Sequence, residues 1–410
     1  MARRVVITGL GLITPLGIGH KKTWEAVCNG QSGVAEITRF DTSDNKTRIA
    51  GEVKGFNPED FMSAREVRRD DPFIHYAIAA TGLAIKDSGL EITDSISPRV
   101  GMIIASGIGG TTTYCDMVRT LDEKGPGRVS PFFIPNVVTN MAAGYASIKF
   151  NARGPNCSTT TACAASGHSL SLAAMLIKNG DADAMIAGGS EAPLVPLTVA
   201  GFNVIKALST RNDDPATASR PFDLDRDGFI LAEGAGIVVL EEFEFAKARG
   251  ADIYAEVLGA GMTGDAHHIT APSLDGPVRC MQMALQNSGV NPDEIDYINA
   301  HGTSTKLNDA NETAAIKEVF GDRAYEIAVS STKSMTGHML GATGTAEACI
   351  CALAIKNSVI PPTINLFTKD PECDLDYVPN EAREAKLKTV LTNSYGFGGT
   401  NSVIALRRVD

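Results

Sequence analysis

One cysteine of the sequence has the surroundings of a nucleophile. Cys163 lies in a run of small residues, 159–167, directly before an apolar stretch with helical character. The first turn of a helix carries a partial positive charge, which stabilises a thiolate, the reactive form of cysteine. Two histidines, His301 and His338, lie in glycine-rich segments further along the sequence. The three residues together indicate acyl transfer through a thioester on the cysteine.

The segments around the two histidines have the character of ligand-binding loops. His301 follows an expected strand at 295–299, and His338 lies in a segment where glycine and threonine recur. A further glycine-rich turn, at 393–401, can direct backbone N–H groups at an oxyanion, and a plain hairpin has the same sequence character. These segments supply candidate partners for a cysteine nucleophile.

Other motifs are incomplete or absent. His168 lies five residues beyond Cys163, which turns it away from that face of a helix, and we interpret it as a packing residue. The run Gly9-Leu10-Gly11 begins like a dinucleotide-binding loop, but Thr14 stands where the third glycine belongs. The eight cysteines show no C-x-x-C spacing, so neither a disulfide framework nor a zinc site is favoured.

Composition bounds the class of protein. With 410 residues, 43% of them hydrophobic and 21% charged, the sequence predicts two or three domain-sized units with a large core. The net charge of −11 argues against a nucleic-acid partner. The N-terminus enters a strand without a signal peptide, and no apolar run reaches membrane-spanning length, which favours a cytoplasmic protein with reduced cysteines. A cluster of Arg65, Arg68 and Arg69 is either a solvated helix face or a docking site for an acidic partner.

Strands and helices are expected to alternate. Apolar runs predict strands at 4–8, 100–105, 183–188, 236–240, 253–258, 295–299, 389–393 and 401–407. Helices are predicted at about 72–88, 163–178, 276–288, 309–320 and 342–356. This alternation favours a layered α/β fold.

A weak internal repeat divides the sequence. Residues 174–180 resemble residues 352–358, at an offset of 178, and this offset relates Cys163 to Gly341. Either the likeness is a chance similarity of two helix ends, or two similar halves place two helix N-termini toward a shared centre. The second interpretation predicts an N-terminal half, 1–251, that carries the cysteine and a C-terminal half, 252–410, that carries both histidines.

Four motifs, in order, resemble those of one enzyme family. They are the segments 161–166, 301–305, 333–338 and 396–401, and the likeness covers nearly the whole length. The sequence resembles the β-ketoacyl-acyl carrier protein synthases of the elongating II type. The resemblance implies an acyltransferase with the thiolase fold, a five-layered α/β/α/β/α sandwich of two pseudo-duplicated halves.

The resemblance also implies a decarboxylative Claisen condensation of the ping-pong type. Cys163 would take an acyl group from acyl carrier protein, and a malonyl thioester on a second carrier would lose carbon dioxide and attack it, adding two carbons. His301 and His338 would hydrogen-bond the malonyl thioester oxygen and stabilise the enolate. Backbone N–H groups of Cys163 and Phe397 would form the oxyanion hole, and Phe397 would gate the malonyl site.

Further positions receive roles from the same resemblance. Lys333 and Glu347 would order the site electrostatically. Ile108, Phe133 and Phe202 would line the acyl pocket. Thr303 and Thr305 would contact the phosphopantetheine arm. Thr270, Gly398 and Gly399 would contact the rest of the substrate.

The resemblance extends to partners. Arg65, Arg68 and Arg69 would receive the acidic carrier protein, and Phe133 would reach across a homodimer. No metal or cofactor of the protein's own is implied, because decarboxylation drives the reaction and phosphopantetheine arrives on the carrier.

Alternative functions stay open at this point. A ketosynthase of polyketide or other secondary metabolism would share the chemistry with different acyl partners. A non-catalytic chain-length-factor subunit would lack the cysteine, so Cys163 argues against it. A cysteine hydrolase would need one histidine with an orienting residue, and a thiolase would need a second cysteine where His338 stands.

Overall fold

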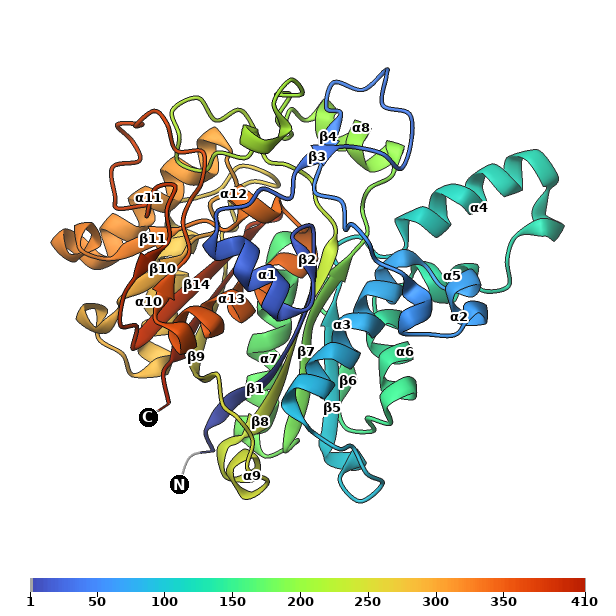
Figure 1. Ribbon diagram of the computed structural model, residues 1–410, viewed down its shortest axis with the longest axis horizontal. Helices are drawn as coiled ribbons and strands as arrows, with labels where there is room; N and C mark the ends of the chain where they lie inside the picture. The colour runs from blue at the N-terminus through green and yellow to red at the C-terminus, as the bar shows by residue number, and fades with distance from the viewer. Residues whose placement is uncertain (1–2, 410) are drawn as a thin grey trace.

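The strands form one long mixed sheet in this computed structural model, which describes residues 3–409 (Figure 1). Its strand order is β11-β10-β14-β15-β9-β1-β8-β7-β5-β6, with β2 on β1. The strands of this sheet are β1 Val5–Thr14, β2 Gly17–Ile18, β5 Val100–Ala105, β6 Asn156–Cys157, β7 Ala184–Glu191, β8 Gly234–Glu242, β9 Ala255–Gly264, β10 Tyr297–Asn299, β11 Ala328–Ser330, β14 Thr389–Gly396 and β15 Thr400–Arg407. Two small separate ladders pair β3 Ala35–Glu36 with β4 Ile49–Ala50, and β12 Val359–Ile360 with β13 Arg383–Glu384.

The sheet consists of two halves with the same strand order. Pairing runs β1-β8-β7-β5-β6 in the first half and β9-β15-β14-β10-β11 in the second, and in each the first two pairings are antiparallel and the last two parallel. The halves join where β1 pairs with β9 over only two residue pairs. This pattern confirms the pseudo-duplication. The domain boundary predicted between residues 251 and 252 lies in the link between α9 and β9 and stays a prediction.

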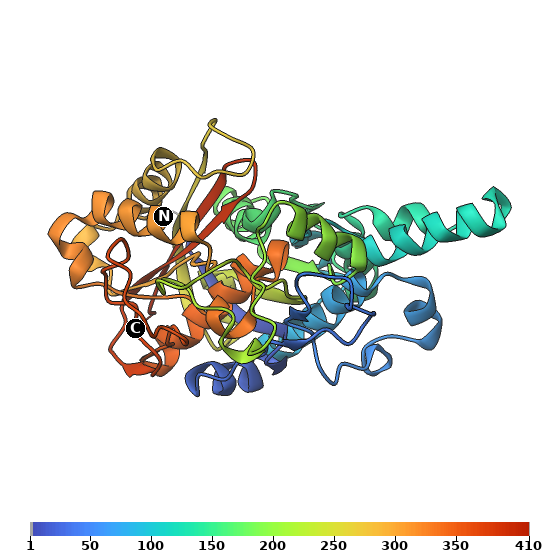
Figure 2. The same cartoon turned by 90° about the horizontal axis from the view of Figure 1, so that it is seen from above.

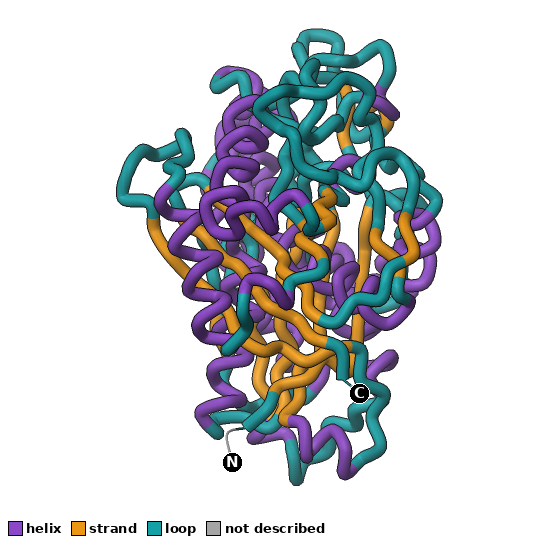
Figure 3. The backbone as a smooth tube through the Cα atoms, turned by 90° about the vertical axis from the view of Figure 1, so that its left-hand side faces the viewer, coloured by secondary structure: helices purple, strands orange, loops and turns teal. Residues whose placement is uncertain are grey.

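The helices cover the sheet in layers. They are α1 His20–Cys28, α2 Ala64–Arg69, α3 Pro72–Ser88, α4 Thr111–Lys124, α5 Phe133–Val137, α6 Met141–Phe150, α7 Ala165–Asn179, α8 Pro196–Val204, α9 Phe243–Ala248, α10 Asp275–Ser288, α11 Lys306–Phe320, α12 Lys333–Thr336 and α13 Thr343–Asn357. In Figure 3 the strands lie between helices on either side. Within residues 3–409, no helix combines the length and the apolar character that crossing a bilayer requires.

Three of the hydrophobic clusters lie between the five layers. One joins α3 and α6 to the outer face of the first half-sheet, one surrounds α7 and α13 between the half-sheets, and one joins α10 and α11 to the outer face of the second. Strand β5 shows how the sequence encodes this: Met102 and Ile104 enter the outer core, and Ile103 enters the central one. Because both faces are covered, the strand is apolar throughout. The layers confirm the five-layered sandwich.

The two central helices confirm the internal repeat. Helix α13 begins and ends 178 residues after α7, and each follows a single 3₁₀ turn, Ala162–Ala164 and Leu340–Ala342. The first residue of each turn is left-handed, with φ of 49° at Ala162 and 44° at Leu340. The likeness of the two segments is therefore structural, and Cys163 and Gly341 occupy equivalent positions.

The predicted elements agree with the observed ones, with one large omission. Helix 72–88 is α3, which begins with Asp71 as its N-cap and ends at a left-handed Gly89. The strand predicted at 4–8 extends to Thr14, since every residue of β1 is buried. The largest omission is the run of α4, α5 and α6, of which α4 projects from the protein (Figures 1 and 2). The shorter helices α1, α8, α9 and α12 were not predicted either.

Candidate active site

One pocket, of about 570 Å³, gathers most of the predicted site residues. It is lined by Cys163, His301, His338, Phe397, Ile108, Phe202, Thr270, Thr303, Thr305 and Gly399. Gly398 lies in the same turn as Phe397, outside the lining. Lys333 and Glu347 lie behind the pocket wall, and Phe133, Arg65, Arg68 and Arg69 lie outside it. The sequence thus identified a real cavity that draws residues from both halves.

Cys163 lies at the N-terminal end of the α7 segment, as predicted. It is half-buried in the 3₁₀ turn that the left-handed Ala162 begins. The β14–β15 hairpin comes close to it, since a Cβ placed on Gly396 would lie 3.1 Å from the Cys163 nitrogen. Glycine at this position therefore lets the next residue, Phe397, bring its backbone N–H beside the sulfur.

The surroundings of Cys163 favour the thiol over the thiolate. Burial raises the pKa of Cys163 to about 12, with Glu191 acting in the same sense, while Lys333 and the N–H groups of Phe397 and Cys163 oppose the rise. The raised pKa runs against the thiolate that we expected a helix N-terminus to stabilise, because burial disfavours the charged form. The proton must therefore leave during the reaction with an electrophile.

Alkylation of Cys163 by iodoacetamide should accelerate steadily with pH. With the pKa raised, the thiolate fraction grows about tenfold per pH unit between about pH 7 and pH 9, without a plateau. Peptide mass mapping of Cys163 at a series of pH values measures this rate, and a Cys163→Ala variant identifies the signal of the other cysteines. A plateau near neutral pH would contradict the dominance of burial.

The two histidines face each other across the pocket. His301 follows β10 and His338 follows α12, their ring centroids are 5.4 Å apart, and both side chains are buried. His338 Nδ1 lies 3.1 Å from the Thr343 hydroxyl, and His338 Nε2 has no partner among the described residues. Burial and then Lys333 hold the pKa of each imidazole well below its usual range, and His338 lowers that of His301 further. Both rings are neutral at pH 7, and a ring N–H can donate to a substrate oxygen.

A buried ion pair lies behind the histidines. Lys333 Nζ is 2.7 Å from Glu347 Oε1, and both side chains are almost fully buried. Burial raises the pKa of Glu347 to about 7, against the opposing effect of Lys333. Since Lys333 also acts on the pKa values of Cys163 and both histidines, the pair controls the charge of the site without lining the pocket.

The loop that carries His301 and the two threonines is tightly held. The N–H groups of His301 and Gly302 each donate to the Glu312 carboxylate at 2.8 Å. Between Thr303 and Thr305, whose hydroxyls lie 2.9 Å apart, Ser304 is left-handed with φ of 70°. Asp309 accepts from the Ser304 N–H at 3.1 Å and so stabilises this conformation.

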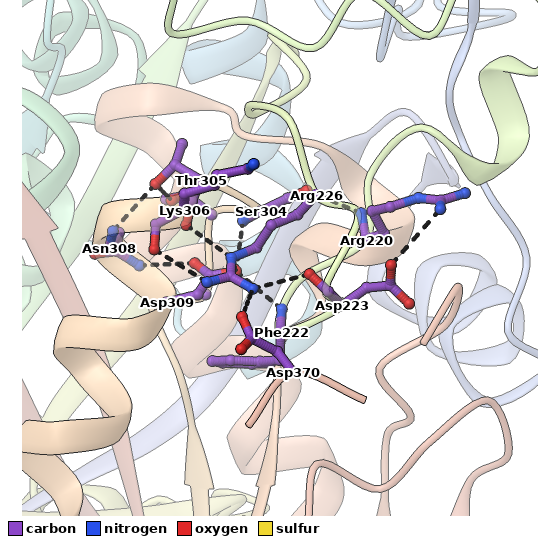
Figure 4. A network of polar contacts seen from close by, with 12 residues as sticks. Arg220, Phe222, Asp223, Arg226, Ser304, Thr305, Lys306, Asn308, Asp309 and Asp370 are labelled. Atoms are coloured by element: carbon purple, nitrogen blue, oxygen red, sulfur yellow. Dashed lines mark hydrogen bonds and ion pairs between the residues drawn. The ribbon is translucent and has the colours of Figure 1, made fainter. Parts of the chain in front are cut away.

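A buried arginine fixes the same loop from outside the pocket (Figure 4). Arg226 is 2% exposed and donates to the carbonyls of Thr305 and Lys306 at 3.1 and 3.0 Å. It also donates to the Asp370 carboxylate at 2.5 Å and the Asp223 carbonyl at 2.8 Å. Arg226 was not predicted, since its partners lie up to 144 positions away and form no local motif.

Two loops meet at the mouth of the pocket. The Gly398 N–H donates to the Ile269 carbonyl at 2.7 Å, and Asn401 donates to the Asp265 carboxylate at 2.7 Å. Thr270, one residue beyond Ile269, is exposed at the mouth. Asp265 lines the pocket as well and was not predicted, because nothing in its local sequence distinguishes it.

A second cavity, of about 400 Å³, adjoins the first. Ile108 lines both, and no other lining residue of the two described cavities is shared. Phe133 lines neither of the two described cavities and packs on Tyr114, a residue of the second cavity, with ring centroids 6.1 Å apart.

The three arginines of α2 differ in availability. Arg65 and Arg68 are exposed. Arg69 instead pairs with Asp70 through two hydrogen bonds of 2.5 and 2.8 Å, and its guanidinium lies 4.9 Å from the Tyr145 ring centroid. The first two side chains are thus free to meet a partner, while the third holds the local structure.

His168 behaves as the sequence analysis expected of a packing residue. Its Nδ1 lies 2.7 Å from the Thr161 hydroxyl and its Nε2 3.1 Å from the Asn401 carbonyl, so both ring nitrogens have partners within the protein. It does not line the pocket.

The comparisons with known proteins agree with this site. The models of the beta-ketoacyl synthase N-terminal and C-terminal domains match residues 2–246 and 254–367. The 3-oxoacyl-[acyl-carrier-protein] synthase 2 of Coxiella burnetii is 53% identical over 99% of both sequences. Two solved structures are similar over 100% of each chain at 37% identity: the ishigamide ketosynthase/chain length factor, with a TM-score of 0.94, and a type II PKS ketosynthase in complex with its acyl-carrier protein, with a TM-score of 0.90. The chain therefore belongs to the beta-ketoacyl synthase family.

Proposed function

We propose that the protein elongates fatty acyl chains by decarboxylative condensation, as a β-ketoacyl-acyl carrier protein synthase of type II. The observation that carries this proposal is the pocket in which Cys163 faces two neutral imidazoles, His301 and His338. The 53% identity to a 3-oxoacyl-[acyl-carrier-protein] synthase 2 supports fatty acid elongation as the pathway.

The first half-reaction transfers the acyl group to Cys163. The sulfur attacks the thioester carbonyl of the acyl carrier, and the N–H groups of Cys163 and Phe397 stabilise the oxyanion. The carbon–sulfur bond to the carrier breaks, and the proton of the cysteine thiol ends on the phosphopantetheine thiol that leaves. A protonated Cys163 suits this exchange, because the proton that its thiol loses is the one that the departing phosphopantetheine thiol gains.

The second half-reaction forms the new carbon–carbon bond. His301 and His338 donate to the thioester oxygen of the malonyl group, which loses carbon dioxide and becomes an enolate. The enolate carbon attacks the acyl carbonyl on Cys163, and the sulfur leaves and takes up a proton. Neutral imidazoles suit this step, because they donate hydrogen bonds without attracting the malonyl carboxylate as cations would. Lys333 and Glu347 act on the histidines from behind.

The substrate reaches the cysteine on a phosphopantetheine arm. Thr303 and Thr305 line the pocket, and their hydroxyls would contact this arm. Phe397, which is 39% exposed, would gate the entrance together with Thr270, Gly398 and Gly399. We propose that the protein needs no metal or cofactor of its own.

The direct test supplies a medium-chain acyl carrier protein and malonyl-carrier protein and analyses the product by mass spectrometry. The expected product is a β-ketoacyl carrier that is two carbons longer, with release of carbon dioxide. An acylated protein without any extended product would overturn condensation, and no acylation would favour a non-catalytic subunit. The alternative, a secondary-metabolite ketosynthase, is favoured by the similarity to a type II PKS ketosynthase, and acceptance of only functionalised acyl groups would support it.

A charge reversal at Arg68 should impair reaction with the carrier protein. We propose that α2 receives an acidic acyl carrier protein, in keeping with the ketosynthase complex with such a partner. Arg68→Glu should lower kcat/KM for acyl-carrier protein about tenfold and spare an acyl N-acetylcysteamine thioester. Lys247→Glu on α9, at the far end of the protein (Figure 1), is the matched control. Equal losses with both substrates would instead indicate damage to the fold.

We propose that the protein is a homodimer through its projecting side. Large apolar side chains are exposed on and beside α4 and α5: Tyr114, Val118, Leu121, Phe132, Ile134 and Val138. A monomer rarely exposes so many together. Dimerisation would cover them and bring the partner's Phe133 toward the second cavity. Light scattering should give twice the mass of one chain.

We propose that the protein works in the cytoplasm. Its eight cysteines are all free thiols, and four of them are buried. The fold therefore does not depend on disulfide bonds, as is usual for proteins of a reducing compartment.

A further inference from the structure

A buried carboxylate, that of Glu191, holds the loop of residues 106–109, which lies beside the second cavity. Glu191, the last residue of β7, is fully buried, and its two oxygens accept four hydrogen bonds. Oε1 accepts from the Ser106 hydroxyl at 2.8 Å and the Ile108 N–H at 3.1 Å. Oε2 accepts from the N–H groups of Gly107 at 2.7 Å and Gly341 at 3.0 Å. This carboxylate therefore joins the two halves of the protein.

These bonds leave the loop little freedom. The Ser106 hydroxyl also accepts from the Gly109 N–H at 2.9 Å, so four consecutive residues are fixed directly or indirectly by one carboxylate. On the other side the loop is pressed against the segment before α6, because a Cβ on Gly110 would lie 1.9 Å from the Asn136 carbonyl oxygen. The backbone that carries Ile108 is held from both sides.

The Ile108 side chain stands between the two cavities. As the one lining residue that both share, it separates the cavity of Cys163 from the cavity of about 400 Å³. An acyl group on Cys163 that outgrows the first cavity must displace Ile108 to enter the second. A short acyl group needs no such displacement.

We propose that Glu191 is a positioning residue that restricts long acyl chains by holding Ile108 across the entrance to the second cavity. This inference rests on the proposed function. Glu191 does not touch the substrate and acts through the backbone of residues 106–109. Loosening its hold should lower the barrier to displacing Ile108 and should favour long acyl chains over short ones.

Glutamine at this position should release Ile108 in particular. An amide nitrogen on the Oε2 side would leave both Gly107 and Gly341 without an acceptor. On the Oε1 side, the Ser106 hydroxyl can turn and accept from the amide, so only the Ile108 N–H loses its acceptor. The second orientation loses fewer hydrogen bonds and is therefore the expected one.

The test measures acylation of Cys163 by butanoyl- and tetradecanoyl-carrier protein, using intact mass over time. Glu191→Gln should raise the ratio of the tetradecanoyl rate to the butanoyl rate about fivefold. Glu241→Gln, which alters a buried carboxylate of β8 outside both cavities, is the matched control and should leave the ratio unchanged. A ratio in Glu191→Gln equal to that of the unaltered protein would overturn the inference. No acylation of the unaltered protein by either donor would instead overturn the proposed function.

Two further variants separate positioning from general damage. Ser106→Ala keeps the carboxylate but removes the hydroxyl that ties it to Gly109, and it should shift the ratio in the same direction by a smaller factor. In an Ile108→Ala background, Glu191→Gln should have no further effect on the ratio, because the displaced side chain is gone. An undiminished effect in that background would show that Glu191 does not act through Ile108.

Discussion

Replacing Cys163 by alanine is expected to abolish the covalent acyl adduct and to lower condensation by about 10⁴-fold or more. The sulfur is the proposed nucleophile of the pocket, and the N–H groups of Cys163 and Phe397 beside it would stabilise an oxyanion. Alanine keeps the backbone of the 3₁₀ turn and removes only the sulfur. Intact-protein mass after mixing with a medium-chain acyl carrier protein measures the adduct, which should equal one acyl group in the unaltered protein.

The control for this prediction is Cys157→Ala. Cys157 is exposed and lies outside the pocket, so this variant loses a reactive sulfur without touching the site. It should form the adduct like the unaltered protein. An adduct that persists in Cys163→Ala, or disappears in Cys157→Ala, would contradict the assignment of the nucleophile.

Replacing Cys163 by glutamine should convert the protein into a malonyl decarboxylase. The side-chain amide presents a carbonyl where the acyl thioester would stand, so the site resembles the acylated enzyme. The enolate does not condense with this amide, because an amide is a much weaker electrophile than a thioester and has a poor leaving group. Decarboxylation of malonyl-carrier protein should rise above that of the unaltered protein. Adding His338→Ala should then lower this activity about 10²-fold to 10³-fold, because a donor to the enolate oxygen is lost.

Release of labelled carbon dioxide from malonyl-carrier protein measures this second effect. His20→Ala in the same Cys163→Gln background is the control, since His20 lies on α1 away from the pocket. Equal decarboxylation with and without His338 would remove the proposed role of the imidazole. If Cys163→Gln does not decarboxylate malonyl-carrier protein, a site that resembles the acylated enzyme is not sufficient for decarboxylation, which contradicts this prediction.

Local patterns were sufficient to predict the frame of the protein, and most of the predicted site residues line its pocket. Asp71, Pro72 and Gly89 mark both ends of α3, and the offset of 178 residues identified a repeat that holds from the strained turn to the end of the helix. The contacts of Glu191 and Arg226 were not predicted from the sequence, because each residue depends on partners that only the fold brings together. The raised pKa of Cys163 was not predicted for a related reason: it results from burial, and the sequence near residue 163 does not reveal the degree of burial.

The omission of α4 has a different cause. None of its residues is buried within the protomer, so the segment contributes nothing to a core and lacks the strongly apolar character of a buried helix. Tyr114, Val118 and Leu121 nevertheless recur at helical spacing. This stripe is the signal that predicts a helix whose apolar face is satisfied by another molecule.

Gly341, which occupies the position equivalent to Cys163 in the second half, is packed against Gly107 and Glu191. A Cβ on Gly341 would lie 2.4 Å from the Gly107 nitrogen and 2.7 Å from Glu191 Oε2, so no side chain fits there. The duplicated architecture thus offers two similar cradles, of which one holds a reactive sulfur and the other lends its backbone amide to the wall of the first. A side chain at Gly341 would require the loop of residues 106–109 to move, so packing maintains the difference between the two halves.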